Sequence, residues 1–180
     1  MENKKNKGLV IVYTGNGKGK TTAALGVALR AAGHGKKTLI VQFIKSFQNY
    51  GEIKFVKKYH CGIAIKILGK GYVKIKGDRY PFEEHVKTAK KALQYAEEQI
   101  LSKKYDIVVL DEINIALDKK LITIQEIVDL IQQKPPDLHI ILTGRSAPKK
   151  LIQLADLVSE VKEIKHPFRK GILAQKGIEY

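Results

Sequence analysis

A glycine-rich loop between an apolar strand and a helix is the feature that most limits what this chain can fold into. Residues 10–22 read VIVYTGNGKGKTT, a β-branched run followed by a loop with three glycines, the last of which begins Gly-Lys-Thr. This order of strand, loop and helix is the setting in which a P-loop motif is credible. Glycines let successive backbone N–H groups turn toward a phosphate, and the helix N-terminus adds a partial positive charge. The sequence therefore predicts a site for nucleotide phosphates.

The residues of this loop have different chemical roles. Lys20 can reach the phosphates as a point charge, and the hydroxyl of Thr21 is placed to bind Mg²⁺. The general motif begins with glycine five positions before Gly19, where this chain has Thr14. We assign nucleotide binding to the continuous run Gly15, Asn16, Gly17, Lys18, Gly19, Lys20, Thr21 and Thr22.

A pair of acidic residues follows a second apolar run. Residues 105–110 (YDIVVL) lead directly into Asp111 and Glu112. A carboxylate at this place can bind Mg²⁺ opposite the Thr21 hydroxyl, and in hydrolases the second acidic residue often activates water. A solvated turn at a strand end is the alternative explanation.

Apolar runs alternate with helical patterns along the chain. We expect strands at 8–13, 38–43, 63–68, 105–110, 139–142 and 157–164, and helices at 21–32, 81–102, 123–133 and 148–154. Residues 44–62 and the glycine- and lysine-rich loop over 69–78 show no clear period. The alternation predicts an α/β fold of the P-loop NTPase-like type, a doubly wound and mostly parallel sheet with helices on both faces.

Ligands of such sheets bind at the carboxyl ends of the strands. The glycine loop, the acidic pair and residues 143–145 (TGR) all follow expected strands, so we expect them to form one site. Arg145 can supply a cation to the nucleotide or to a second substrate, and a structural salt bridge fits the sequence equally well. No Ser-His-Asp or clustered histidine pattern occurs, so no protein nucleophile is predicted.

Composition limits the class of protein. We expect one domain over residues 8–180 after a flexible basic tail at 1–7. The net charge is +15, but the basic residues are spread along the chain, so we expect small anionic ligands and no nucleic-acid partner. No apolar run approaches the ~20 residues that span a bilayer. The N-terminus lacks the apolar core of a signal peptide, which favours a cytoplasmic protein without a membrane partner.

Several segments together resemble the ATP:corrinoid adenosyltransferases, the cob(I)alamin adenosyltransferase family that carries a P-loop. That family also has threonine at the place of the first glycine of the general motif. The resemblance covers nearly the whole chain from Gly8. The similar segments are 13–24 (YTGNGKGKTTAA), 32–35 (AGHG), 41–45 (VQFIK), 110–114 (LDEIN), 143–148 (TGRSAP), 164–168 (IKHPF), Gly171 and 174–180 (AQKGIEY).

The resemblance implies an enzyme that transfers the 5′-deoxyadenosyl group of ATP to the cobalt of a reduced corrinoid and releases triphosphate. Reduced cobalt is then the nucleophile, and the protein supplies orientation and charge neutralisation. By the same resemblance, residues 16–22 hold the triphosphate with ATP in reversed orientation. Thr21 and Glu112 bind Mg²⁺, with Asp111 as a further candidate, and Arg30 lies near the nucleoside. The family also suggests a homodimer, and a reductase protein is a candidate partner.

This chain departs from the family pattern at the residues that are expected to contact the corrinoid. The family inserts aromatic side chains below the corrin ring, from a glycine-aromatic-x-tryptophan pattern. The matching residues 71–74 read GYVK, so Tyr72 is expected to face the corrinoid and Lys74 takes the place of tryptophan.

Two other functions use the same motifs. A generic P-loop NTPase or kinase needs only the loop and the acidic pair. A basic nucleotide-dependent nucleic-acid-binding module needs the loop and the positive charge. The products of ATP turnover distinguish the first of these from an adenosyltransferase, and the salt dependence of binding distinguishes the second.

Overall fold

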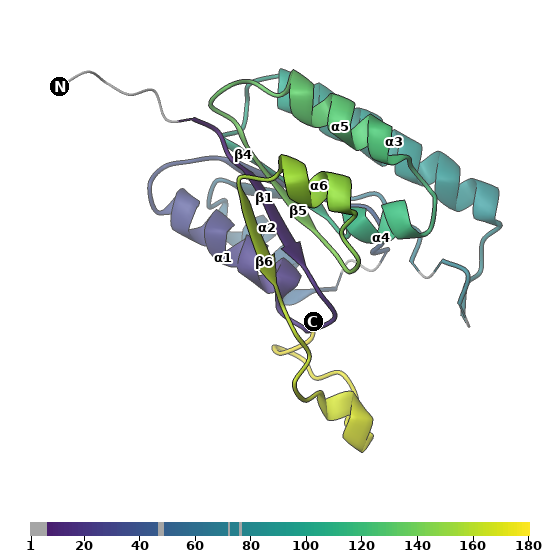
Figure 1. Ribbon diagram of the computed structural model, residues 1–180. Helices are drawn as coiled ribbons and strands as arrows, with labels where there is room; N and C mark the ends of the chain where they lie inside the picture. The colour runs from purple at the N-terminus through teal and green to yellow at the C-terminus, as the bar shows by residue number, and fades with distance from the viewer. Residues whose placement is uncertain (1–6, 47–48, 72, 76) are drawn as a thin grey trace.

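A six-stranded parallel sheet forms the centre of the computed structural model, which describes residues 7–46, 49–71, 73–75 and 77–180 (Figure 1). The strand order is β3-β2-β4-β5-β1-β6, and every neighbouring pair is parallel. The strands are β1 (Val10–Thr14), β2 (Thr38–Gln42), β3 (Ile63–Ile67), β4 (Ile107–Asp111), β5 (His139–Thr143) and β6 (Leu157–Glu160). The helices are α1 (Lys20–Ala32), α2 (Gly51–Tyr59), α3 (Phe82–Leu101), α4 (Ile113–Asp118), α5 (Ile124–Gln133) and α6 (Lys149–Leu154).

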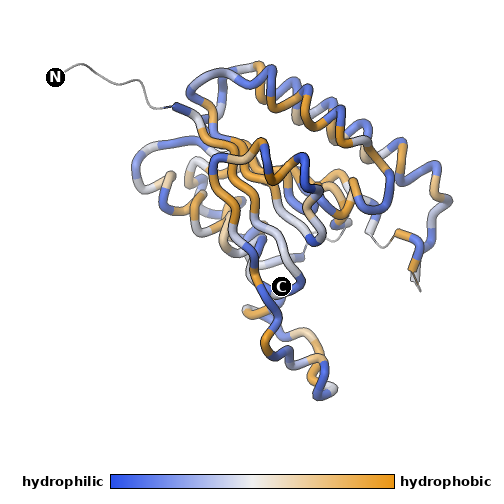
Figure 2. Tube along the Cα trace, viewed as in Figure 1, coloured by the Kyte–Doolittle hydropathy of each residue, from blue (hydrophilic) through white to orange (hydrophobic). Residues whose placement is uncertain are grey.

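Both faces of the sheet are covered, as the continuous apolar strands predict. Val10 and Val12 of β1 point into the larger core, which includes buried side chains of α3, α4, α5 and α6. Ile11 points the other way and packs with Ala24 and Ala28 of α1. Figure 2 shows the same arrangement as apolar strands between helices whose outer sides are hydrophilic. The expected fold class is therefore confirmed.

Three details differ from the expectation. Helix α2 lies within the segment 44–62, where no element was predicted, and Ile53 is its one buried residue. Helix α4 has only six residues and begins directly after the acidic pair. Strand β6 ends at Glu160 rather than at 164, and a 3₁₀ turn (Pro167–Lys170) follows in the arm that leaves the sheet in Figure 1.

Of the tail expected at 1–7, only Lys7 belongs to the described residues. Its ammonium pairs with Asp156 at 3.0 Å, so this residue is tied to the domain. Within the described ranges, no helix combines the length and the apolar character that crossing a membrane requires.

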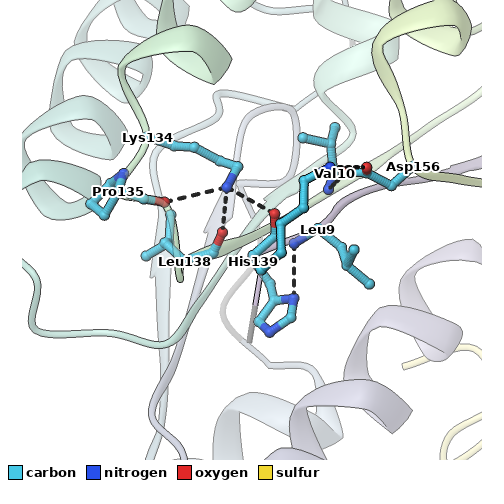
Figure 3. Close-up of polar contacts among 9 residues, drawn as sticks. Leu9, Val10, Lys134, Pro135, Leu138, His139 and Asp156 are labelled. Carbon is cyan, nitrogen blue, oxygen red and sulfur yellow. Dashed lines mark hydrogen bonds and ion pairs between the residues drawn. The ribbon is translucent and has the colours of Figure 1, made fainter. Parts of the chain in front are cut away.

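Side chains at the amino ends of the strands hold the beginning of β1 in place (Figure 3). Nδ1 of His139 accepts a hydrogen bond from the backbone N–H of Leu9 at 3.1 Å, and Asp156 accepts from the N–H of Val10 at 2.8 Å. Lys134 Nζ donates to three main-chain carbonyl oxygens at 2.9, 3.0 and 3.3 Å. These contacts satisfy backbone groups that the sheet leaves unpaired, and they fix the strand that leads into the glycine loop.

Protonation of His139 is expected to destabilise the fold at mildly acidic pH. Burial, with help from Lys134 and Lys36, lowers the pKa of His139 from its ordinary 6.5. The unfolded chain then binds this proton at a higher pH than the folded chain does. The stability that neutral His139 contributes is therefore present above about pH 6.5 and is lost as the pH falls toward the folded pKa.

Urea unfolding at several pH values between 7.5 and 5.5 measures this effect. The free energy of unfolding of the wild type should fall more steeply with acidification than that of His139→Asn, whose side chain does not titrate. The same slope in both proteins would contradict the assignment.

Candidate nucleotide site

A cleft of about 540 Å³ lies at the carboxyl ends of the strands and brings together most of the predicted site residues. Residues 16–22 of the glycine loop line it. Glu112, which follows β4, and Arg145, which follows β5, line the same cleft. The expectation that these strand ends form one site therefore agrees with the structure.

Two glycines of the loop, Gly15 and Gly17, are required by close backbone contacts. Gly15 has a φ of +99°, and a Cβ there would lie 2.4 Å from the carbonyl oxygen of Val161. A Cβ on Gly17 would lie 2.7 Å from the carbonyl oxygen of Lys162. The N–H of Gly17 donates to the Val161 carbonyl at 2.7 Å. The loop is thus packed directly against the segment that follows β6.

Thr14 stands where the general motif has its first glycine, and its side chain makes a contact that glycine could not make. Its hydroxyl accepts a hydrogen bond from the backbone N–H of Ala147 at 3.1 Å. This contact joins the end of β1 to the loop after β5, and a glycine would have no atom to make it. The structure therefore accommodates a side chain at position 14, although the neighbouring Gly15 must be glycine. This explains why threonine replaces the first glycine of the general motif.

Lys20 is held inside the loop by a contact with the main chain. Its side-chain Nζ donates to the carbonyl oxygen of Gly17 at 2.6 Å, and the residue is 7% exposed. Burial lowers the pKa of Lys20 and Arg145 adds to this effect, whereas the carboxylates of Glu112 and Asp111 oppose it. A phosphate oxygen in the cleft would offer the ammonium a charged acceptor, which is stronger than a neutral carbonyl.

Asp111 is fully buried, and protein donors engage both of its carboxylate oxygens. One oxygen accepts from the hydroxyls of Thr21 at 2.8 Å and Thr143 at 2.7 Å. The other lies 3.1 Å from Gln42 Nε2 and 3.1 Å from Lys45 Nζ. Because the Thr21 hydroxyl donates to Asp111, its lone pairs are free to bind a metal. Asp111 therefore orients the Thr21 hydroxyl and is itself surrounded by protein donors.

Glu112 has a different environment. Its backbone is left-handed with a φ of +62°, and its N–H donates to the Thr143 hydroxyl at 2.9 Å. A Cβ on Gly144 would lie 3.2 Å from Oε2 of Glu112, so this glycine leaves room for the carboxylate. Burial and the nearby Asp111 raise the pKa of Glu112, and three cations oppose the rise. Within the described ranges, no hydrogen bond or ion pair engages the Glu112 side chain.

These two side chains fit a magnesium ion better than a transition metal. A hydroxyl on Thr21 and a carboxylate on Glu112 are hard oxygen ligands of the kind that Mg²⁺ takes, together with waters and phosphate oxygens. The described residues contain no group of three or more His, Cys, Asp or Glu that could hold a metal by themselves. A site that is completed by the nucleotide is consistent with both observations.

Comparison with known proteins assigns the chain to a family. The family described as "ATP:corrinoid adenosyltransferase BtuR/CobO/CobP" matches residues 6–180. The chain belongs to this family.

Curated relatives of this family member carry the same designation. A corrinoid adenosyltransferase from Sinorhizobium sp is 43% identical over 176 residues, which cover 97% of this chain and 81% of that protein. A corrinoid adenosyltransferase from Escherichia coli K12 is 36% identical over 174 residues, with 97% and 86% covered. Among solved structures, the flagellar accessory protein FlaH from Methanocaldococcus jannaschii matches with a TM-score of 0.59 over 86% of this chain and 71% of that chain. At 12% identity this last similarity concerns the fold alone.

Arg30 does not line the cleft. Arg30 lies in the last turn of α1, ten residues after Lys20, which corresponds to about 15 Å of helix. It lines a separate cavity of about 970 Å³ at the amino ends of the strands, together with Asp106 and His139. The expected position near the nucleoside is therefore not supported by this geometry.

The corrinoid-facing prediction for Tyr72 falls outside the described residues. Lys74, at the position where the family has tryptophan, has its ammonium 3.6 Å from the centroid of the Phe82 ring. A cation over an aromatic face is attracted electrostatically. Lys74 is thus engaged with an aromatic side chain of α3 and does not simply extend into solvent.

Several residues that line the cleft were not predicted from the sequence, among them Lys45 and the C-terminal segment. Lys45 follows β2 and lines the cleft, and the rule that ligands bind at strand ends could have identified it. Residues 177–180 also line the cleft, and Glu179 pairs with Lys18 of the loop at 3.0 Å. Nothing in the local sequence indicates that the C-terminal segment returns to the loop.

Substitution of Gly15 is expected to damage the loop of this family member more than its fold. In Gly15→Ala, a left-handed φ costs roughly 1–2 kcal/mol, and the close carbonyl of Val161 adds to this cost. ATP affinity, measured by calorimetry, should therefore fall at least about tenfold, which corresponds to ~1.4 kcal/mol.

Gly26→Ala is the matched control in the adjacent helix. No atom lies within 4 Å of a Cβ at Gly26, and alanine in a helix interior is favoured over glycine by ~1 kcal/mol. This variant should unfold at a higher urea concentration and bind ATP normally. Wild-type ATP affinity in Gly15→Ala would show that the loop tolerates a different backbone.

Proposed function

We propose that the cleft binds ATP with its triphosphate on residues 16–22 and with Mg²⁺ between Thr21 and Glu112. In this arrangement C5′ of ATP faces a reduced corrinoid, and the enzyme transfers the 5′-deoxyadenosyl group to cobalt. The observation that carries the proposal is that the two residues of the acidic pair have different hydrogen-bond partners. Asp111 orients the Thr21 hydroxyl, while the Glu112 carboxylate lies in the cleft without a protein donor among the described residues.

The reaction needs charge neutralisation more than acid–base chemistry. Cobalt supplies the electron pair for the new Co–C5′ bond, and the pair of the breaking C5′–O bond leaves with triphosphate. Bound Mg²⁺ would neutralise part of the charge on the phosphate oxygens. Lys18, Lys20 and Arg145 line the same cleft and add fixed positive charge where negative charge develops. No protein nucleophile is required, in agreement with the sequence.

The surroundings of the cleft support further parts of the proposal. Ile164, Phe168 and Leu173 of the C-terminal arm are 85%, 70% and 75% exposed, so these apolar side chains are available for contact with another chain. We therefore retain the homodimer that the family suggests. A cytoplasmic location, a reductase partner and a corrinoid-facing Tyr72 also stay proposals, and they rest on the sequence and its resemblance.

The products of the reaction test the function directly. With ATP, Mg²⁺ and chemically reduced cob(I)alamin, the protein should form adenosylcobalamin, seen in the visible spectrum, and intact triphosphate, seen by ³¹P NMR. Without the corrinoid, ATP should remain unchanged. Release of ADP and phosphate at a comparable rate without corrinoid would favour the NTPase alternative.

Substitution of Lys20 is expected to change the affinity for ATP, and substitution of Glu112 is expected to change the requirement for Mg²⁺. Lys20→Ala removes a charge-assisted contact, worth roughly 1.5–3 kcal/mol, so ATP affinity should fall about 10–100-fold. Glu112→Gln should mainly raise the Mg²⁺ concentration needed for half-maximal adenosylation, because a neutral amide is a weaker ligand than a carboxylate.

Glu83→Gln, at an exposed position in the first turn of α3, is the control for loss of a carboxylate. All three variants should be checked for folding by circular dichroism. A wild-type Mg²⁺ requirement in Glu112→Gln would remove Glu112 from the assigned metal site.

A further inference from the structure

Lys45 is a cation in the cleft that has no role in the reaction as proposed. Its side chain is 20% exposed, and Nζ lies 3.1 Å from Oδ2 of Asp111. The ammonium also lies 5.2 Å from the centroid of the Tyr50 ring, and both residues line the cleft. Lys45 is therefore held at the metal end of the site, between a buried carboxylate and an aromatic face.

Lys45 balances charge in the metal-free site. Asp111 and Glu112 place two carboxylates next to each other in largely buried positions, and an uncompensated buried carboxylate is costly. Among the ion pairs within 4 Å that the described residues form, only that of Lys45 involves this acidic pair. The ammonium therefore supplies the direct compensation that the carboxylates need before a metal binds.

Substrate binding changes this balance. A Mg²⁺ ion between Thr21 and Glu112 brings two positive charges to the same carboxylates and repels the neighbouring ammonium. At the same time, the triphosphate brings negative charge into the cleft that Lys45 lines. Both effects favour movement of the ammonium away from Asp111 and toward the phosphates.

We propose that Lys45 is an exchangeable counter-ion, which compensates Asp111 and Glu112 in the metal-free enzyme and turns to the triphosphate when Mg²⁺ and ATP bind. This inference rests on the proposed function because it requires a metal between Thr21 and Glu112. In the loaded enzyme, Lys45 adds a cation to the leaving group as the C5′–O bond breaks. A long and flexible side chain suits a group that exchanges partners.

Metal binding without nucleotide tests the first half of the proposal. Mn²⁺ takes the same oxygen ligands as Mg²⁺, and its free concentration can be followed by electron paramagnetic resonance. Lys45→Met removes the competing ammonium, so Mn²⁺ should bind roughly tenfold more tightly. The ammonium repels a metal ion at close range, and its removal leaves the two carboxylates to the metal.

Two variants control for charge. Lys45→Arg keeps the positive charge and should bind Mn²⁺ as the wild type does. Lys54→Met removes an exposed lysine of α2 that does not line the cleft, and it should leave Mn²⁺ affinity unchanged. If Lys45 only fills space, Lys45→Met should have a lower melting temperature and the wild-type affinity for Mn²⁺. This result would overturn the proposal.

Adenosylation kinetics test the second half. Loss of a cation that acts on the leaving group should lower kcat of Lys45→Met about 10²-fold, with a smaller change in the KM for ATP. Lys45→Arg should recover part of the loss. An unchanged kcat in Lys45→Met would contradict the role at the triphosphate.

Failure of this inference and failure of the proposed metal site give different results. If Glu112→Gln leaves Mn²⁺ binding unchanged, the metal site itself is wrong. If Glu112→Gln weakens Mn²⁺ binding but Lys45→Met does not strengthen it, only the role of Lys45 fails. Should Lys45→Met not fold, a crystal structure of the wild type with Mg²⁺ and ATP decides. Nζ of Lys45 must then have left Asp111, and a retained contact near 3.1 Å would overturn the proposal.

Discussion

The burial of one carboxylate, that of Asp111, connects the fold of this protein to its site. A buried charge must be satisfied by donors, and here the donors come from three separate parts of the chain. Thr21 belongs to α1, Lys45 follows β2 and Thr143 ends β5. They meet because β4 lies between β2 and β5 in the sheet. The order of the strands therefore helps to fix the position of the Thr21 hydroxyl, which we propose as a metal ligand.

Much of this arrangement could be predicted from the sequence, for a physical reason. Strands covered on both faces are continuous apolar runs, so they stand out from the rest of the chain. The carboxyl ends of parallel strands share one edge of the sheet, and polar residues that follow such runs are expected to meet there. The glycine loop, Glu112 and Arg145 followed this rule and line one cleft.

The parts that could not be predicted depend on contacts between distant residues. Whether Asp111 or Glu112 faces the cleft is decided by the left-handed backbone at Glu112 and by the donors around Asp111, and neither is visible in local sequence. Helix α2 has only nine residues and buries only Ile53, so its signal in the sequence is weaker than that of the 20-residue helix α3. The expected place of Arg30 near the nucleoside came from the resemblance to the family and not from a pattern in the sequence. The length of α1 alone separates it from Lys20 by about 15 Å.

Internal contacts engage the cations that we propose to bind the substrate. Lys20 donates to a loop carbonyl, Lys18 pairs with Glu179 and Lys45 pairs with Asp111. If the cleft binds ATP and Mg²⁺ as proposed, the ligands must compete with each of these contacts. The net affinity for ATP is therefore a difference between two sets of contacts, smaller than the contacts in the loaded site suggest. An enzyme that must release triphosphate gains from this, because the internal contacts can re-form as the product leaves.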